Sequence, residues 1–134
     1  MFTLEIHTPY RLFFSDEVQS LTVLLEDGEI GICTGHAPFT APVCTGILKI
    51  KDKNGNRKEA FTTEGIVEVK NKTILMVEAA EWPEEIDEAR ALAAKHDAEE
   101  TLKTRILKFE TAAAKSKLKR AETRLKVRGR AGPA

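Results

Sequence analysis

One break in composition constrains the fold of this chain more than any other feature. Seven of its eight aromatic residues and six of its eight glycines precede Pro83, and the stretch between Pro83 and Gly129 contains neither glycine nor proline. Glycine and proline mark turns between short elements, whereas a long stretch without them is typical of helices. We therefore expect two domains with different secondary structure, one over residues 1–83 and one over residues 84–134.

The formal net charge of the chain is zero, but the charges are divided unevenly. Residues 1–83 hold 8 basic and 12 acidic side chains, whereas residues 84–134 hold 13 basic and 9 acidic ones. Near the C-terminus a single acidic residue, Glu122, lies among basic residues, namely Lys115, Lys117, Lys119, Arg120, Arg124, Lys126, Arg128 and Arg130. Such a cluster attracts an acidic surface of a protein, a nucleic acid or a lipid headgroup layer. A solvated helix face is the alternative.

Short runs of β-branched and aromatic residues, separated by turn residues, predict strands throughout the first domain. These runs lie at residues 2–6, 12–14, 18–25, 30–33, 47–51, 66–69 and 74–77, with Phe61 between residues 47–51 and 66–69. Asn54 and Gly55 predict a two-residue hairpin turn. Eight to ten short strands in about 80 residues predict a small antiparallel sandwich or barrel.

Apolar residues at helical spacing run through the second domain. The later stripe comprises Leu107, Thr111, Ala114, Leu118, Ala121 and Leu125, and two earlier partial stripes comprise Ile86, Ala89 and Ala93, and Ala91, Ala94, Ala98 and Leu102. A hairpin of two helices with a turn near residues 103–108 fits these stripes, and one long helix is the alternative. A buried alanine methyl contributes about 0.8 kcal/mol, against roughly 1.5–3 kcal/mol for leucine, so we expect weakly held helices.

The sequence contains no motif of a catalytic or metal site. It has no phosphate-binding loop, no H-E-x-x-H and no C-x-x-C. His36, in a Gly-His-Ala-Pro turn, is more typical of a loop or interface residue than of a catalytic base. Cys33 and Cys44 lie among apolar residues and are expected to be buried thiols in a reducing cytoplasm. Neither a membrane span nor a secretory signal is expected.

Four motifs, taken in their order along the chain, carry a family resemblance. They are residues 28–32 (Gly-Glu-Ile-Gly-Ile) with residues 35–38 (Gly-His-Ala-Pro), residues 64–69 (Glu-Gly-Ile-Val-Glu-Val), residues 86–91 (Ile-Asp-Glu-Ala-Arg-Ala) and residues 124–127 (Arg-Leu-Lys-Val). Together they resemble the ε subunit of the F-type ATP synthase, of the bacterial type. The family usually has a second glycine where this chain has Glu64.

This resemblance implies a non-catalytic subunit of the rotating central stalk, which couples ion flow to ATP synthesis. It implies an N-terminal sandwich of about ten strands that binds the γ subunit and sits on the ring of c subunits. It also implies a C-terminal helical hairpin that can leave the sandwich, extend along γ among the catalytic α and β subunits, and inhibit ATP hydrolysis. The implied location is the cytoplasmic face of the bacterial membrane, where the complex holds the subunit.

The resemblance also assigns residues to these roles. Glu29 and His36 fall where the family contacts γ and the c ring. The residues implied in regulatory ATP binding to the folded hairpin are Ile86, Asp87, Arg90, Ala91, Arg120 and Arg124. Those implied in the inhibitory contact with an acidic segment of the catalytic β subunit are Lys115, Lys119, Arg120, Arg124 and Lys126. No metal is implied, and pairing of Asp87 with Arg90 within the helix is the alternative to ATP binding.

Two other functional classes are weighed against this interpretation. One is a free-standing β domain whose basic helical tail binds nucleic acid or an acidic protein. The other is a small-molecule-binding barrel with a helical lid, for which some 80 residues in many short strands leave little room.

Overall fold

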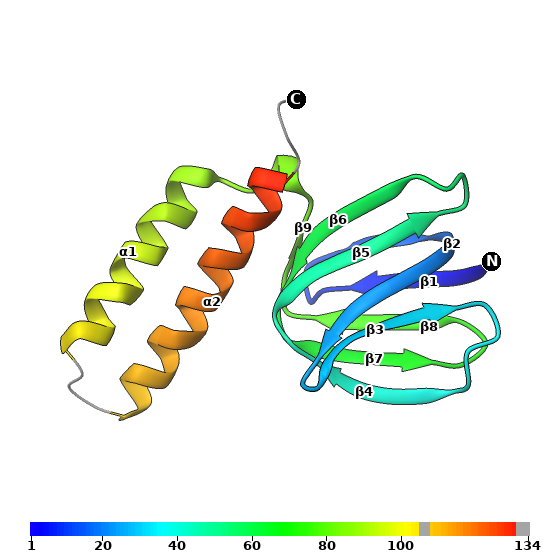
Figure 1. Ribbon diagram of the computed structural model, residues 1–134, viewed down its shortest axis with the longest axis horizontal. Helices are drawn as coiled ribbons and strands as arrows, with labels where there is room; N and C mark the ends of the chain where they lie inside the picture. Colours follow the sequence, from blue (N-terminus) through cyan, green and yellow to red (C-terminus); the bar gives the residue numbers. More distant parts are fainter. Residues whose placement is uncertain (105–107, 131–134) are drawn as a thin grey trace. The chain divides into compact units, whose positions relative to one another are not determined.

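The computed structural model describes residues 1–104 and 108–130, and it divides the chain into two compact units, Met1–Trp82 and Pro83–Ala134. The first unit consists of strands (Figure 1), which are β1 (Phe2–His7), β2 (Leu12–Leu25), β3 (Gly28–Cys33), β4 (Phe39–Val43), β5 (Gly46–Asp52), β6 (Arg57–Thr62), β7 (Gly65–Val69), β8 (Thr73–Val77) and β9 (Ala80–Glu81). The second unit consists of a 3-10 turn, η1 (Pro83–Glu85), and the helices α1 (Glu88–Thr104) and α2 (Lys108–Arg130).

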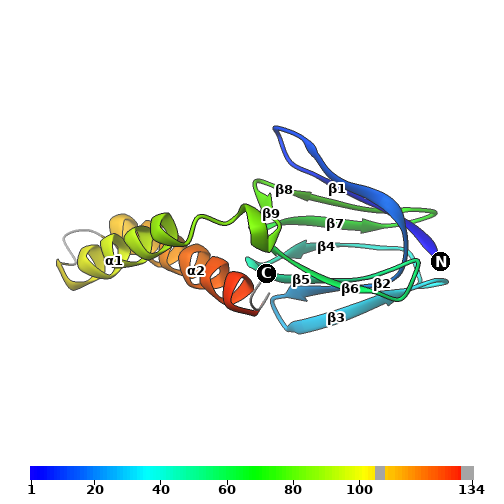
Figure 2. The ribbon, with the colours of Figure 1, turned by 90° about the horizontal axis from the view of Figure 1, so that it is seen from above.

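The strands form a two-layered sandwich, which Figure 2 shows from above. Neighbouring strands follow the order β4-β7-β8-β1-β2-β5-β6-β9, with β3 paired to β2. The 14-residue β2 pairs with β1 along its first half and with β3 and β5 along its second half, so it passes from one layer to the other. In the part of the chain that the structure describes, β1 and β8 run parallel and the other paired strands run antiparallel.

The predicted sandwich is confirmed, with nine strands in the described residues where about ten were expected. The runs at residues 12–14 and 18–25 are one strand, because Ser15 and Glu17 between them are exposed but pair with β1. The sequence analysis missed β4 and β9. Strand β4 contains Pro42, which cannot donate to a ladder and is therefore tolerated at the edge of the sheet, where β4 lies.

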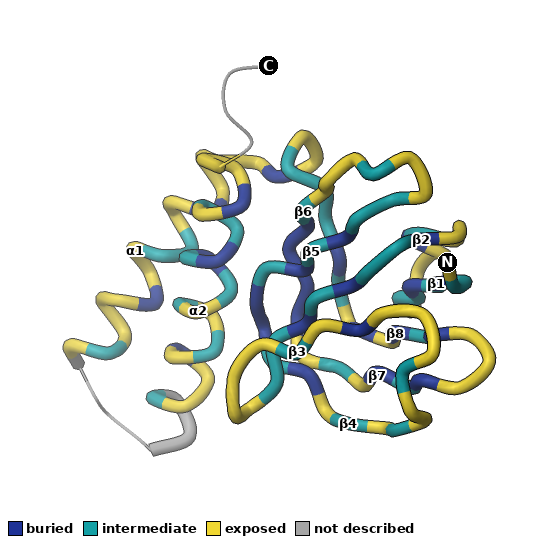
Figure 3. Tube along the Cα trace, turned by 45° about the vertical axis from the view of Figure 1, so that its right-hand side comes forward, coloured by how far each residue is buried: buried dark blue, intermediate teal, exposed yellow. Residues whose placement is uncertain are grey.

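The core of the sandwich is built from the inward-facing residues of alternating positions, seen as buried segments in Figure 3. Leu4, Ile6, Leu21, Ile50 and Leu75 are at most 1 % exposed. The expectation of two buried thiols is wrong. Cys33 is exposed and Cys44 is half-buried, and Cys33 pairs with Ser20, on the face of β2 that points away from buried Leu21.

The turn at Asn54–Gly55 is longer than predicted. The Asp52 N–H donates to the Asn56 carbonyl (2.8 Å) and the Gly55 N–H donates to the Asp52 carbonyl (3.0 Å), which leaves three residues in the loop. Gly55 has a φ of +83°, which suits the third position of a three-residue hairpin. The Asp52 side chain also accepts the N–H groups of Asn54 and Asn56, which fixes the turn from within.

The helical unit is a hairpin in which α1 and α2 pack along each other (Figure 1). Most of the predicted turn, residues 105–107, lies outside the described residues, as does Leu107 of the later stripe. The buried alanines come from the two predicted seams, namely Ala91, Ala98, Ala114 and Ala121. The other partial stripe was wrong, because Ala89 and Ala93 are exposed. Ile86 precedes the start of α1 at Glu88, so it does not share the helical phase of those alanines.

Within residues 1–104 and 108–130, neither helix is both long and apolar enough to cross a lipid bilayer.

Candidate functional site

Glu29 and His36 lie at opposite ends of β3. Glu29 is exposed, and its Oε1 lies 3.4 Å from the Lys49 ammonium. His36 lies in the turn after β3, where its N–H donates to the Cys33 carbonyl (3.1 Å) and its ring lies 5.1 Å from the ring of Phe39. The four residues of extended strand from Glu29 to Cys33 span roughly 13 Å, and the turn that holds His36 follows them. A partner that contacts both must therefore cover a broad surface.

The motif at residues 86–91 contains the residue that caps the start of α1. Asp87 is the N-cap residue of α1: its Oδ1 accepts the Arg90 N–H (3.1 Å) and its carbonyl accepts the Ala91 N–H (3.0 Å). The Asp87 carboxylate therefore contacts the backbone of Arg90, where the sequence had suggested a pairing of the two side chains. Ile86 and Ala91 are both buried, at 4 % exposed.

The basic residues of α2 form two stripes. Successive residues in a helix are rotated by 100°, which places Lys115, Lys119 and Lys126 on one side of the alanine seam. The same rotation places Arg120, Arg124 and Arg128 on the other side. Lys115, Lys119 and Lys126 are exposed, whereas Arg120 and Arg124 are half-buried. The five residues expected to make the inhibitory contact are thus split between two faces of α2.

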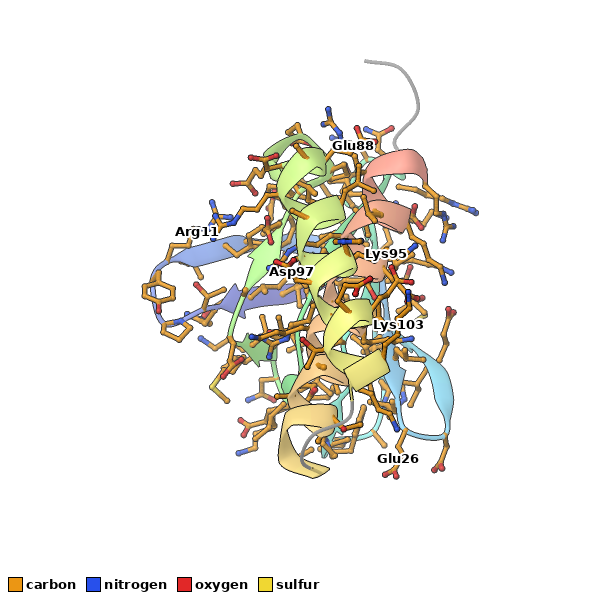
Figure 4. The ribbon with its side chains drawn as sticks, turned by 90° about the vertical axis from the view of Figure 1, so that its left-hand side faces the viewer. Arg11, Glu26, Glu88, Lys95, Asp97 and Lys103 are labelled. Carbon is orange, nitrogen blue, oxygen red and sulfur yellow. The ribbon has the colours of Figure 1, made fainter. Side chains whose placement is uncertain are left out.

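The charges of α1 differ from those of α2. Figure 4 labels Glu88, Lys95, Asp97 and Lys103, which are four charged residues of α1. Helix α1 carries both acidic and basic side chains, and the Lys103 ammonium lies 3.5 Å from the Glu100 carboxylate. The predominantly positive surface of the hairpin therefore belongs to α2.

The residues expected to bind ATP come from the start of the helical unit and from the second half of α2. The last turn of α2 lies against η1, and an Arg128 Nη1 donates to the Pro83 carbonyl (3.2 Å). Counting back along α2 by its rise of 1.5 Å per residue puts Arg124 and Arg120 beside the first turns of α1, where Asp87 and Arg90 lie.

The sequence analysis missed an apolar row on the outer face of the sandwich. In Cα register across five strands it comprises the apolar residues Pro42, Ile66, Met76 and Leu12, with His7 between Met76 and Leu12. Ile66 is 46 % exposed, Met76 47 % and Leu12 54 %. The unbroken apolar run of β8 was the available signal, because a strand with one face in water ordinarily alternates apolar and polar residues. We call these five residues the outer row.

A charged cluster includes His7 of the outer row. Glu5 accepts hydrogen bonds from His7 Nε2 (2.8 Å) and from Lys72 Nζ (3.0 Å). These bonds, that of His7 first, hold the pKa of the Glu5 carboxyl below its ordinary value of 4.5. Glu5 therefore stays ionised beside the apolar residues. In residues 1–104 and 108–130 no group of His, Cys, Asp and Glu could hold a metal ion.

The chain matches two family models over most of its length. Residues 1–83 match the β-sandwich domain of the ATP synthase Delta/Epsilon chain, and residues 84–129 match its long alpha-helix domain. Among curated relatives, the ATP synthase epsilon chain of Caldanaerobacter subterraneus is 48% identical over 128 residues, covering 94% of this chain and 92% of the relative. That of Ruminiclostridium cellulolyticum is 40% identical over 130 residues, covering 96% of each.

Two solved structures share the fold. A chain of the Euglena gracilis mitochondrial ATP synthase (OSCP/F1/c-ring) matches with a TM-score of 0.80 at 19% identity, covering 91% of this chain and 78% of that one. A chain of the Tetrahymena thermophila mitochondrial ATP synthase (central stalk/c-ring) matches with a TM-score of 0.62 at 19% identity, covering 95% and 96%. The chain has a sandwich followed by a helical hairpin, and the two curated relatives are 40% and 48% identical to it over nearly its whole length. The protein therefore belongs to the family of bacterial ATP synthase epsilon chains, which are non-catalytic subunits of that complex.

Proposed function

We propose that this epsilon chain is a rotor subunit of the central stalk, whose sandwich binds the γ subunit and rests on the ring of c subunits. The observation that carries this proposal is the outer row. Exposed sheet faces are ordinarily polar, whereas Leu12, Ile66 and Met76 leave about half of their surface in water. An apolar face of γ would cover that surface, and Glu29 on the separate β3 edge is left for the c ring.

We further propose that the helices inhibit ATP hydrolysis. Lys115, Lys119 and Lys126 form an exposed cationic stripe, which complements an acidic segment of the catalytic β subunit. Arg120 and Arg124 lie on the other stripe, so one acidic segment would reach all five residues only if it wrapped around α2.

Regulation by ATP is the third part of the proposal. The site would use Arg90, Arg120 and Arg124 at one end of the hairpin, with Asp87 capping α1 and the buried Ile86 and Ala91 shaping the helix start. A ligand at a hundred times its dissociation constant stabilises the state that it binds by about 2.7 kcal/mol. ATP would thereby favour the folded hairpin and relieve inhibition.

The attachment is tested by co-purification with γ. Met76→Glu places a charge in the outer row and should abolish co-purification, because a buried unpaired carboxylate is strongly unfavourable. Leu92→Glu makes the same kind of change at an exposed leucine of α1 and should leave co-purification intact. Equal retention of both variants would contradict docking through the outer row.

Inhibition is tested by the ATPase activity of the reconstituted catalytic complex. The full chain should inhibit hydrolysis, and a chain ending at Pro83 should not. Equal inhibition by the two chains would contradict the role of the helices. Binding of duplex nucleic acid with a steep salt dependence, in the absence of any ATP synthase subunit, would instead favour the basic-tail alternative.

A further inference from the structure

One residue of the outer row can change its charge. His7 is in Cα register with Met76 of β8 on one side and with Leu12 of β2 on the other. Met76 is 47 % exposed and Leu12 54 %, and the His7 side chain is 42 % exposed. A partner that covers the two apolar side chains therefore also covers the imidazole between them and removes it from water.

The imidazole is hydrogen-bonded to a carboxylate that already has a cation beside it. His7 Nε2 donates to Glu5 Oε1 (2.8 Å), and Glu5 Oε2 accepts the Lys72 ammonium (3.0 Å). An ionised carboxylate only accepts, so Nε2 carries the proton of the neutral ring and a second proton would add at Nδ1. The charges of the three side chains sum to zero when the ring is neutral, and protonation leaves one positive charge in excess.

The charged residues on the two strands beside β1 do not alter this balance. Strand β8 (Thr73–Val77) contains none, and the exposed Glu78 follows its end. Arg11 precedes β2, whereas Asp16 and Glu17 on that strand pair with β1 three and four positions before His7. Arg11 and Glu78 carry opposite charges, so His7 decides the excess charge at this point of the outer row.

We propose that His7 makes docking on the outer row dependent on pH, with the neutral imidazole accepting an apolar face of γ and the imidazolium opposing it. This inference rests on the proposed docking of γ at the outer row. An apolar partner removes water from the cluster, and this step is far more costly when the cluster holds an uncompensated charge. Lys72 already compensates Glu5, so a proton on His7 adds excess charge and completes no ion pair.

The direction of the pH dependence follows from the form that docks. An ordinary histidine side chain is almost entirely neutral at pH 8 and about nine-tenths protonated at pH 5.5. The apparent dissociation constant rises as the fraction of the binding-competent form falls, so it should be about tenfold higher at pH 5.5. Glu5 remains ionised over this range, because the hydrogen bonds from His7 and Lys72 hold its pKa below 4.5.

The experiment measures the affinity of the full chain, at pH 8 and at pH 5.5, for a catalytic complex that contains γ but lacks an epsilon chain. The wild type should bind about tenfold more weakly at pH 5.5. His7→Gln keeps an N–H donor for Glu5 but takes up no proton, so its two dissociation constants should agree within about twofold. His96→Gln, at an exposed histidine of α1, is the matched control and should retain the tenfold difference.

A permanent charge provides the converse test. His7→Lys should bind about tenfold more weakly than the wild type at pH 8, where the wild-type ring is neutral. Equal pH dependence in the wild type and His7→Gln would overturn the role of His7, as would wild-type affinity of His7→Lys at pH 8. Met76→Glu in the same assay distinguishes this failure from that of the docking itself, because wild-type affinity of Met76→Glu would mean that γ does not bind the outer row at all.

Discussion

At the scale of single residues, Gly65 has no room for a side chain. A Cβ atom there would lie inside contact distance of the Met76 carbonyl oxygen and 2.7 Å from Val77 Cγ1. Backbone cannot yield as a flexible side chain can, so we expect Gly65→Ala to lower the free energy of unfolding by more than about 2 kcal/mol. Denaturant unfolding of the variant measures this change.

Gly31 provides the control for that substitution. It also lies in a strand, but nothing lies within 4 Å of its hypothetical Cβ. Gly31→Ala should therefore change the free energy of unfolding by no more than about 0.5 kcal/mol. Similar losses in the two variants would contradict the steric explanation.

Glu64 stands where the family usually has a second glycine. Its side chain is exposed, which accounts for the tolerance of a non-glycine residue beside Gly65.

Glu5 predicts a dependence of stability on pH. Its pKa is lowered from 4.5 by the hydrogen bonds from His7 and Lys72, so the folded state holds the ionised form. The stabilisation is then complete above the unfolded pKa and is lost as the pH falls through the lower folded pKa. Urea midpoints should fall more steeply below about pH 4.5 in the wild type than in Glu5→Gln. Parallel curves would contradict this assignment.

At the scale of elements, the start of α1 depends on Asp87. Its Oδ1 satisfies the Arg90 N–H, so Asp87→Ala should destabilise the helical unit by about 1 kcal/mol. Asp87→Asn keeps a capping oxygen and should destabilise the unit by only a few tenths of a kcal/mol. Amide exchange in the first turn of α1 measures both. Equal losses in the two variants would indicate that the charge, and not the cap, stabilises this helix.

The elements show what sequence patterns can and cannot predict here. Alternation and alanine spacing predicted most strands and the seam, because each pattern reports which face is buried. They missed β4, since Pro42 argues against a strand unless the strand lies at an edge. They missed the outer row, because its residues meet only through the pairing of five strands, and they missed the bond between Arg128 and Pro83, which are 45 residues apart.

At the scale of the whole molecule, the two units differ in how firmly they are packed. The sandwich core buries leucine, isoleucine and phenylalanine, whereas the seam of the hairpin buries Ala91, Ala98, Ala114 and Ala121. Each buried alanine methyl contributes about 0.8 kcal/mol, against roughly 1.5–3 kcal/mol for a larger side chain, while the cost of ordering the backbone is similar per residue. The helices should therefore open far more often than the sandwich.

Hydrogen exchange of the full chain measures this difference directly. Amides in the middle of α1 and α2 should exchange with a lower opening free energy than those of Ile6 and Leu75, which are fully buried. Helices of low local stability can exchange their packing for another surface at small cost, which is what a mobile inhibitory element requires. If the helix amides were protected as strongly as those of Ile6 and Leu75, such an exchange would need nearly global unfolding, and the proposed inhibition would have no conformational basis.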